Sequence, residues 1–333
     1  MVQFDSIPHV MVITFPLQIV IMNSLVQNIF LIAILFGLGS CKKAEQYGCT
    51  DPNAINYSVL AEEDDGTCTY ESDIPKLIFK FKFDSTQIRY DSFGNVATVP
   101  AEHATQSPSY NAISGHYIEM IPSIWTALGA GEIVYEGENT SAGGAEAVDF
   151  SKASVVGENE EFHSVPIRGL TAGTYEYVRV SVTYQNYDII YNALGFNGLN
   201  GTLASFVGFN TYLETLTVNQ QDVVINDNKL QGYWAFESQG TMTEGQVPTG
   251  GITVVNPHFA SSPIPPGSCL VTGEFETPLV ITGNETEDIT IIISVSTNQS
   301  FEWTDADGNG QYDPLSGDIP VDMGLRGLKA LVE

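Results

Sequence analysis

The chain has 333 residues, of which 12 are lysine or arginine and 40 are aspartate or glutamate, so its formal net charge is −28. A nucleic-acid partner requires a basic surface that neutralises phosphates, and this composition excludes one. The excess of carboxylates suits solubility and divalent cations without identifying a substrate.

The first forty residues are predicted to be a leader. Met22 to Ser40 is an apolar run, and the small residues Gly39 and Ser40 stand directly before Cys41. A short apolar run that ends in small residues is typical of a secretory signal peptide. We therefore expect a signal peptide over residues 1–40, with Met22 as the candidate true start.

The tetrad Leu38-Gly39-Ser40-Cys41 resembles the lipobox of bacterial lipoproteins. The resemblance implies that Cys41 is lipidated and becomes the mature N-terminus. It also implies an extracytoplasmic lipoprotein at the outer membrane or cell surface, with the membrane as a partner through the anchor. Met11 to Ser40 is long enough to span a bilayer, so an uncleaved anchor is the alternative.

The next segment, GCTDPNAINYSVLAEEDDGTC (48–68), is predicted to be a compact loop. Asp51-Pro52 and Asp65-Gly66 are turn formers, and the stretch has no apolar period. Cys49 and Cys68 flank the loop, and a disulfide between them can persist outside the reducing cytoplasm. A metal–thiolate site is disfavoured, because the segment has neither a C-x-x-C pair nor a histidine.

The same segment resembles a short module, GCTDPxAxNYxxxAxxDDGxC, of surface and secreted proteins from Bacteroidetes-type bacteria. The resemblance implies a secreted or surface setting and a disulfide-closed loop, and it implies no activity. We expect residues 41–73 to be a lipid-anchored spacer and residues 74–333 to be the main domain. The remaining cysteine, Cys269, is predicted to be a buried small residue.

From Lys76 onward the chain has the period of β-strands. KLIFKFKFD (76–84) alternates phenylalanines with lysines, which indicates a half-buried strand. TYEYVRVSVTYQ (174–185) places Val178, Val180 and Val182 on one face, with Tyr175, Tyr177 and Arg179 on the other. DITIIISVST (288–297) is apolar enough to be a central strand. Shorter candidates are GEIVYEG, QDVVINDNK, GYWAFES, GITVVN and TPLVITG.

These strands and the Gly- and Pro-rich loops between them predict an all-β fold. GLTAGTYEYVRVSV (169–182) resembles the turn and central strand of immunoglobulin-like and fibronectin-type sandwiches. We expect an antiparallel β-sandwich, immunoglobulin- or jelly-roll-like, with long loops, and an open barrel is the alternative. Ser123 to Leu128 is a candidate helical turn. Residues 193–218 are expected to be a long packed excursion with strands at its end.

The strongest candidate site is the acidic stretch FEWTDADGNGQYDPLSGD (301–318). Counted from Asp305, its oxygen-bearing residues have the spacing of an EF-hand-type calcium loop, with Gly310 at the sharp bend. Position twelve is Ser316 and the flanks are strand-like, so we expect a structural Ca²⁺ site and not a helix–loop–helix sensor. The alternative is a solvated acidic turn. The predicted ligands are Asp305, Asp307, Asn309, Gln311 (through its carbonyl), Asp313 and Asp318.

Weaker candidates lie elsewhere in the main domain. His116 and Met120 offer ligand types that copper accepts. His163 beside Ser164 suggests a hydrolytic pair, but neighbours on a strand point to opposite faces. Five aromatic residues near Asn- and Gln-rich loops could hold a glycan or a peptide, although core packing is their commoner role. They are Tyr184, Tyr187, Tyr191, Tyr233 and Trp234.

The sequence therefore favours a non-enzymatic, extracytoplasmic, lipid-anchored binding or surface-interaction module with a structural calcium loop. Its ligand would be a glycan or a protein. The alternative is a secreted hydrolase that acts on polysaccharide, because two catalytic carboxylates could lie among the 40 acidic residues. A copper-binding periplasmic protein is the third candidate.

Overall fold

The computed structural model describes residues 46–91, 94–247 and 269–333. The chain divides into two compact units between Glu71 and Ser72. The predicted leader, Cys41 and the candidate strand GITVVN lie outside the described residues. Within those residues, no helix is both long and apolar enough to cross a membrane.

The first unit is built around the predicted disulfide, which joins Cys49 to Cys68 with a Cα–Cα distance of 4.8 Å. The short strands β1 (Tyr47–Gly48) and β2 (Glu63–Asp64) pair in parallel beside it. Asn56 bridges the loop, since its amide donates to the Thr67 carbonyl at 2.6 Å and accepts from the Thr69 N–H at 2.9 Å. Polar side chains and the disulfide thus replace the apolar core that this segment lacks.

The main unit consists of β-strands and short 3-10 turns. Its first strands are β3 (Lys76–Asp84), β4 (His103–Gln106), β5 (Ser109–Ile121), β6 (Glu132–Glu136), β7 (Asn139–Thr140), β8 (Ala147–Asp149), β9 (Glu161–Pro166), β10 (Gly173–Ala193) and β11 (Phe196–Phe206). There follow β12 (Thr211–Val218), β13 (Gln221–Lys229), β14 (Tyr233–Ser238), β15 (Thr241–Gln246), β16 (Cys269–Ile281), β17 (Ile289–Ser296), β18 (Phe301–Thr304), β19 (Ile319–Asp322) and β20 (Leu328–Val332). The 3-10 turns are η1 (Glu71–Asp73), η2 (Phe150–Lys152) and η3 (Ile167–Gly169).

The long strand β10 connects the two halves of this unit. One of its edges pairs with β5, and the other pairs first with β16 and then with β11. In the described residues the largest sheet has 11 strands, in the order β15-β14-β11-β10-β16-β20-β17-β3-β9, with β5 and β6 added at β10. Most pairs are antiparallel, but β17–β3 and β16–β20 are parallel, so the sandwich is mixed.

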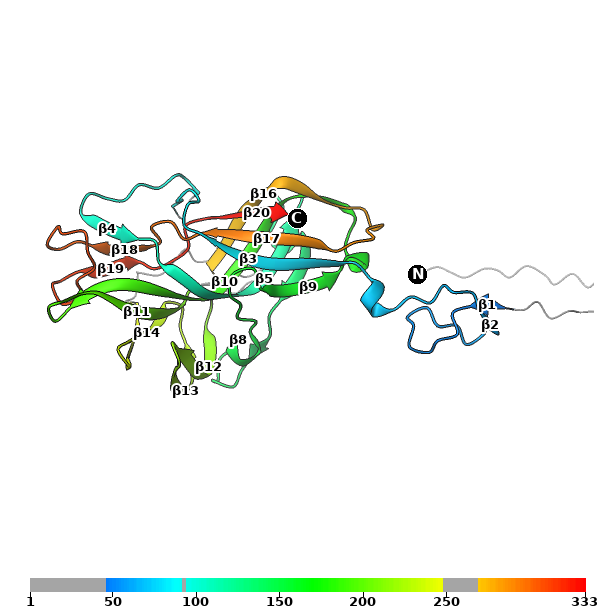
Figure 1. Cartoon of the computed structure of the whole chain (residues 1–333), viewed down its shortest axis with the longest axis horizontal. Coiled ribbons are helices and arrows are strands. Elements are labelled where there is room, and N and C mark those ends of the chain that lie inside the picture. Colours follow the sequence, from blue (N-terminus) through cyan, green and yellow to red (C-terminus); the bar gives the residue numbers. More distant parts are fainter. Residues whose placement is uncertain (1–45, 92–93, 248–268) are drawn as a thin grey trace, which may run out of the picture. The chain divides into compact units, whose positions relative to one another are not determined.

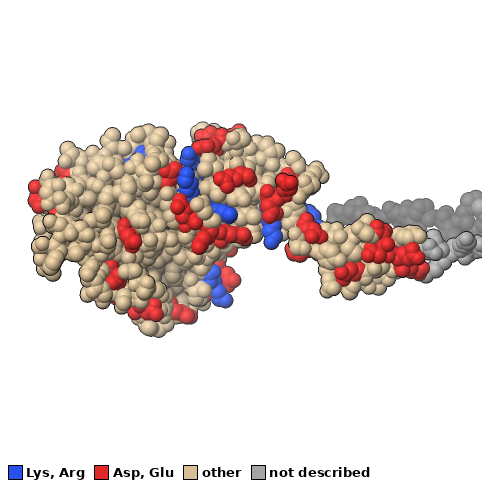
Figure 2. Space-filling view, in the orientation of Figure 1, with Lys and Arg blue, Asp and Glu red and all other residues tan. Residues whose placement is uncertain are grey.

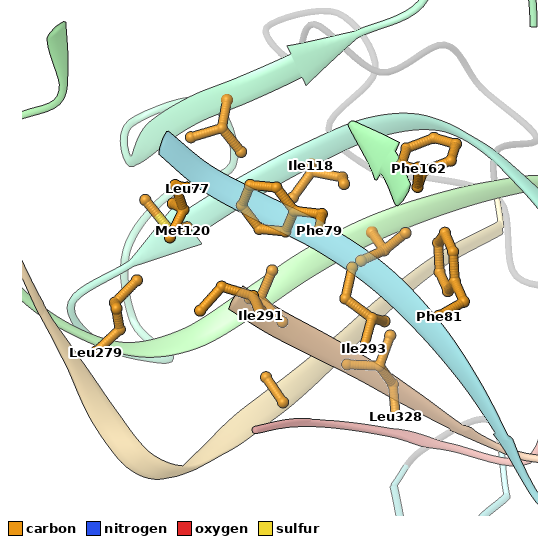
Figure 3. Packing of buried hydrophobic residues seen from close by; sticks show 14 of the residues in the cluster. Leu77, Phe79, Phe81, Ile118, Met120, Phe162, Leu279, Ile291, Ile293 and Leu328 are labelled. Carbon is orange, nitrogen blue, oxygen red and sulfur yellow. The ribbon is translucent and has the colours of Figure 1, made fainter. Parts of the chain in front are cut away.

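The main core lies where this sheet folds over itself. Strand β16 pairs with both β10 and β20, so β3, β17 and β20 pack opposite β5 and β10. Figure 3 shows Phe79 of β3 near Ile118 of β5, with Ile291 and Ile293 of β17 beside it. The predicted alternation of β3 is confirmed, because Leu77, Phe79 and Phe81 are fully buried. The predicted central strand β17 lies between β20 and β3.

The far half of β10 has both faces covered except near its end, where Ile190 is exposed. The sheet β13-β12-β8-β7 packs on one face of β10, β11 and β14, and the sheet β19-β18-β4 packs on the other (Figure 1). Alternate residues therefore enter different cores. Tyr184 of β10 packs with Phe206 and Leu213, whereas Tyr187 packs with Phe301 and Trp303.

The all-β sandwich is confirmed, and two local expectations are corrected. Residues 123–128 form a hydrogen-bonded turn without a helix. Residues 193–218 are not an excursion, because β11 returns directly alongside β10 after a turn at Leu194 and Gly195, both with positive φ. Arg179, on the face of β10 opposite its valines, is buried and pairs with Glu119 of β5.

Candidate functional site

The acidic loop connects β18 to β19, which pair as a hairpin. The buried carboxylate of Asp318 closes its base. One oxygen of Asp318 accepts from the Ala306 N–H at 2.9 Å, and the other accepts from the Asp313 N–H at 2.7 Å. Asp318 therefore links the two sides of the loop at its base, with one carboxylate oxygen bonded to each side.

The tip of the loop brings four predicted ligands together. The Asn309 side-chain amide donates to Asp307 at 2.9 Å and to Asp313 at 2.7 Å. Asp305 accepts from the backbone N–H groups of Asn309 at 3.1 Å and Gly310 at 2.9 Å. Gly310 has φ +73°, a conformation that favours glycine and produces the sharp bend. Carboxylates from three positions thus contact one residue, Asn309, two through its side-chain amide and Asp305 through its backbone N–H.

The Gln311 backbone N–H donates to Asn309 Oδ1 at 2.6 Å, whereas its side chain makes its contact outside this group. Its side-chain oxygen accepts from the Asn192 amide at 2.6 Å, and the Asn192 N–H donates to the Tyr312 carbonyl at 2.8 Å. These bonds dock the loop on the end of β10. Across the described residues, no set of three acidic, histidine or cysteine side chains forms a ready-made metal site. A bound ion would have to replace the amide contacts at the tip.

The five aromatic candidates do not form a surface. Tyr184, Tyr187 and Tyr233 are buried, so they have the core-packing role that is commoner for such residues. The Tyr187 ring stacks on Tyr110 with centroids 4.8 Å apart, and its hydroxyl donates to the Met323 carbonyl. Tyr191 and Trp234 are half-buried in the same layers. The cause is that both faces of β10, β11 and β14 are covered.

The two histidine candidates, His116 and His163, are buried or half-buried in the sheet. His116 is buried, which lowers its pKa, and its carbonyl accepts from the Gly137 N–H. Met120 instead packs in the main core. His163 is half-buried, which lowers its pKa, and its Nε2 lies 3.0 Å from the Val134 carbonyl that accepts its proton. Ser164 follows it on β9 and alternates to the other face.

One group of charges was not predicted from the sequence. Glu302 of β18 is buried and pairs with Arg89, with Arg326 at 3.0 Å and with His103 Nδ1 at 2.5 Å. Burial acts to raise the pKa of Glu302, but the His103 hydrogen bond and the two guanidinium groups outweigh it and lower that pKa. Arg326 also contacts Asp322 at 2.9 Å. The group ties the β18–β19 hairpin to the residues that follow β3.

The described residues of the main unit line a larger and a smaller cavity. The larger, about 1420 Å³, is lined by β16, by residues 320–329 and by the residues on either side of the undescribed segment 248–268. Cys269 lies in it, and burial, with a smaller effect of Asp322, raises the pKa of its thiol to about 11. This half-buried thiol is therefore protonated at neutral pH. The smaller cavity, about 360 Å³, lies over β10 and β11.

The buried carboxylates of the described residues each have a structural partner. Glu119 pairs with Arg179, Glu237 accepts from Asn219, and Glu302 is held by its arginines. Asp318 is occupied by backbone N–H groups. Acidic side chains elsewhere are scattered over the surface, with few basic ones between them on the face shown in Figure 2.

Comparison with known proteins adds no identification. No family model matches the chain, and neither a curated protein nor a solved structure matches it. Its function is therefore argued from its own residues.

Proposed function

We propose that the protein is an extracytoplasmic, lipid-anchored binding or surface-interaction module with calcium as a structural ion. The observation that carries the compartment is the disulfide between Cys49 and Cys68, because such bonds persist outside the reducing cytoplasm. The lipobox-like tetrad before Cys41 supports the lipid anchor.

The anchor is tested with Cys41→Ser in the expressing bacterium. We expect an unlipidated precursor that accumulates unprocessed. Cys269→Ser is the matched control, and it should be processed like the wild type. Normal processing and membrane fractionation of Cys41→Ser would replace the lipoprotein with an uncleaved anchor.

A binding role, as opposed to hydrolysis by a pair of carboxylates, is supported by the contacts of the buried acidic residues. The buried carboxylates serve ion pairs, amide contacts and backbone N–H groups, as expected of structural side chains. Screens of the purified protein on glycan and protein arrays test this role. Retention of a ligand without its cleavage supports a module, whereas hydrolysis of a bound polysaccharide supports the competing enzyme class.

The calcium role is supported by the convergence of Asp305, Asp307 and Asp313 on Asn309. Hard oxygen ligands in a tight loop with a glycine bend suit this ion. The Gln311 side chain, which docks the loop on β10, and Asp318, which closes its base, would remain in place when the ion binds. Calcium should thus rigidify the tip while the hairpin stays paired.

Thermal melts in EDTA and in millimolar calcium test this role. A ligand that binds only the folded state stabilises it by about 2.7 kcal/mol at a hundredfold excess over Kd. The Asp305→Asn/Asp307→Asn variant should lose the increment. The control variant Glu176→Gln/Glu214→Gln, with the same change of charge at exposed positions, should keep it. Coincident wild-type melts with and without calcium would show that the loop is an acidic turn.

A further inference from the structure

We propose that the smaller cavity, over the open end of β10 and β11, binds a neutral carbohydrate. The inference rests on the proposed binding function and gives it a location and a ligand class. The cavity has a volume of about 360 Å³, near the lower end of the range for small-molecule sites. Five of its residues carry the argument: Asp188, Ile190, Asn200, Thr202 and Asn219.

The cavity exists because the covering sheet ends before β10 and β11 do. Strand β12 contributes Val218 to the core, and the chain then turns at Asn219 and Gln220, both with positive φ. Beyond that turn the same face of β10 and β11 continues uncovered. There Ile190 pairs with Asn200, and the Ile190 side chain is 58% exposed.

Asp188 is held in a fixed orientation at the cavity. Its Oδ1 accepts from the Thr202 hydroxyl at 2.7 Å and from the Asn111 amide at 3.0 Å. These two contacts leave its Oδ2 without a hydrogen bond to any described residue. A fixed carboxylate oxygen of this kind accepts strong, charge-assisted hydrogen bonds from hydroxyl groups.

Two amides complete the polar wall. The Asn219 amide nitrogen donates to Glu237, which leaves its carbonyl oxygen for a ligand. The exposed side chain of Asn200 makes no hydrogen bond within the described part of the chain. Side-chain amides both donate and accept, as hydroxyl groups do. The arrangement therefore suits a ligand with several neighbouring hydroxyls.

The Gln106 side chain holds the rim of the cavity, because its amide pairs with the Ile190 backbone as a neighbouring strand would. Gln106 lies beyond the end of the β5–β10 ladder, and its amide exchanges two hydrogen bonds of 2.9 Å with the backbone of Ile190. This contact keeps the exposed Ile190 side chain beside the polar residues. An apolar group next to hydroxyl acceptors is suited to the C–H face of a sugar ring.

Other ligand classes fit this cavity less well. Among the described residues that line it there is no lysine, arginine or histidine, so these residues offer an anion no counter-charge. Asp188 is the one carboxylate among its described lining residues, whereas calcium requires six to eight oxygen ligands. A small cationic amine could pair with Asp188, but it would leave the amides unused. Neutral carbohydrate uses all of these groups.

The test is titration calorimetry on the full chain, purified in a detergent without a sugar headgroup. The probes are the neutral glycans retained in an array screen, with choline as the cationic probe. Asp188→Asn keeps the oxygen that Thr202 and Asn111 donate to, so the fold should be unchanged. We expect this variant and Asn200→Ala each to weaken glycan binding by about tenfold or more. Glu214→Gln, an equal charge change on the neighbouring sheet, should bind like the wild type.

Each result distinguishes the site from the proposed function. Wild-type affinity in Asp188→Asn and Asn200→Ala would place glycan binding elsewhere, and the binding function would stand. Retention of proteins but not glycans, or tighter binding of choline than of any glycan, would overturn the carbohydrate assignment alone. Failure to retain any glycan or protein would overturn both the site and the function. Equal melting temperatures of the variants and the wild type confirm that loss of binding is not loss of folding.

Discussion

Arg179 Nη1 lies 3.3 Å from Glu119 Oε2, and both side chains are closed off from solvent. The same pair holds the β5–β6 connection. Arg179 donates to the Thr126 carbonyl at 2.5 Å, and Glu119 accepts from the Gly131 N–H at 2.7 Å. Each member of the ion pair thus makes a further hydrogen bond to the backbone of this connection.

Replacement of Arg179 by Met should destabilise the main unit by about 3–5 kcal/mol, because Glu119 would remain buried without its counter-charge. Urea unfolding measures this loss. Lys329→Met is the control, since the Lys329–Glu276 pair at 2.6 Å is partly exposed and should contribute about 0–1 kcal/mol. Equal losses in the two variants would mean that solvent screens the Arg179–Glu119 pair.

The disulfide of the first unit provides the second prediction. Its cysteines are 19 residues apart, and closure of such a loop contributes about 3 kcal/mol in the chain-entropy model. The Cys49→Ser/Cys68→Ser variant should expose residues 48–68 to proteases, while residues 72–333 keep the wild-type melting temperature. Limited proteolysis with mass spectrometry locates the cuts. Unchanged cleavage would show that the Asn56 contacts alone hold the loop.

The strands could be predicted from the sequence because alternation is local. Phe79 and Phe81 mark β3 without knowledge of any partner, and the isoleucines of β17 mark a central strand. The spacing from Asp305 to Asp313 likewise lies within one loop, so the gathering of its carboxylates could be anticipated.

The sequence could not show which strands cover each face of β10. The alternation of Tyr184 and Tyr187 indicates two faces, but Leu213 and Trp303, which cover them, follow far along the chain. From the sequence alone, the rings of Tyr184 and Tyr187 were therefore candidates for ligand binding. The Glu302 group was missed for the same reason, since Arg89 comes 213 residues earlier.

Glu302 gives a prediction about pH. Its pKa in the folded protein lies below the ordinary 4.5, because the His103 hydrogen bond and the charges of Arg89 and Arg326 outweigh burial. Its contribution to stability is therefore complete above the ordinary pKa and is lost as the pH falls through the lowered one. Glu302→Gln should be less stable than the wild type at pH 7, and this difference should shrink in acid.

The unfolding free energy in urea, measured from neutral pH down to about pH 3, checks this dependence. Glu102→Gln serves as the control, because Glu102 is an exposed acid on the neighbouring loop. Its profile should follow that of the wild type. A constant difference between Glu302→Gln and the wild type over the whole range would show that the ionisation of Glu302 does not contribute.

The last prediction separates the base of the acidic loop from its tip. Asp318 accepts two backbone hydrogen bonds while buried, so Asp318→Asn turns an N–H donor toward another donor and leaves one of them unsatisfied. The expected cost is about 1–3 kcal/mol, with or without calcium. Asp307 is exposed at the tip, so Asp307→Asn should leave the melting temperature in EDTA unchanged and reduce only the calcium increment. Melts of both variants in EDTA and in calcium test the distinction. A normal melting temperature of Asp318→Asn in EDTA would mean that the paired strands β18 and β19 hold the loop without its buried carboxylate.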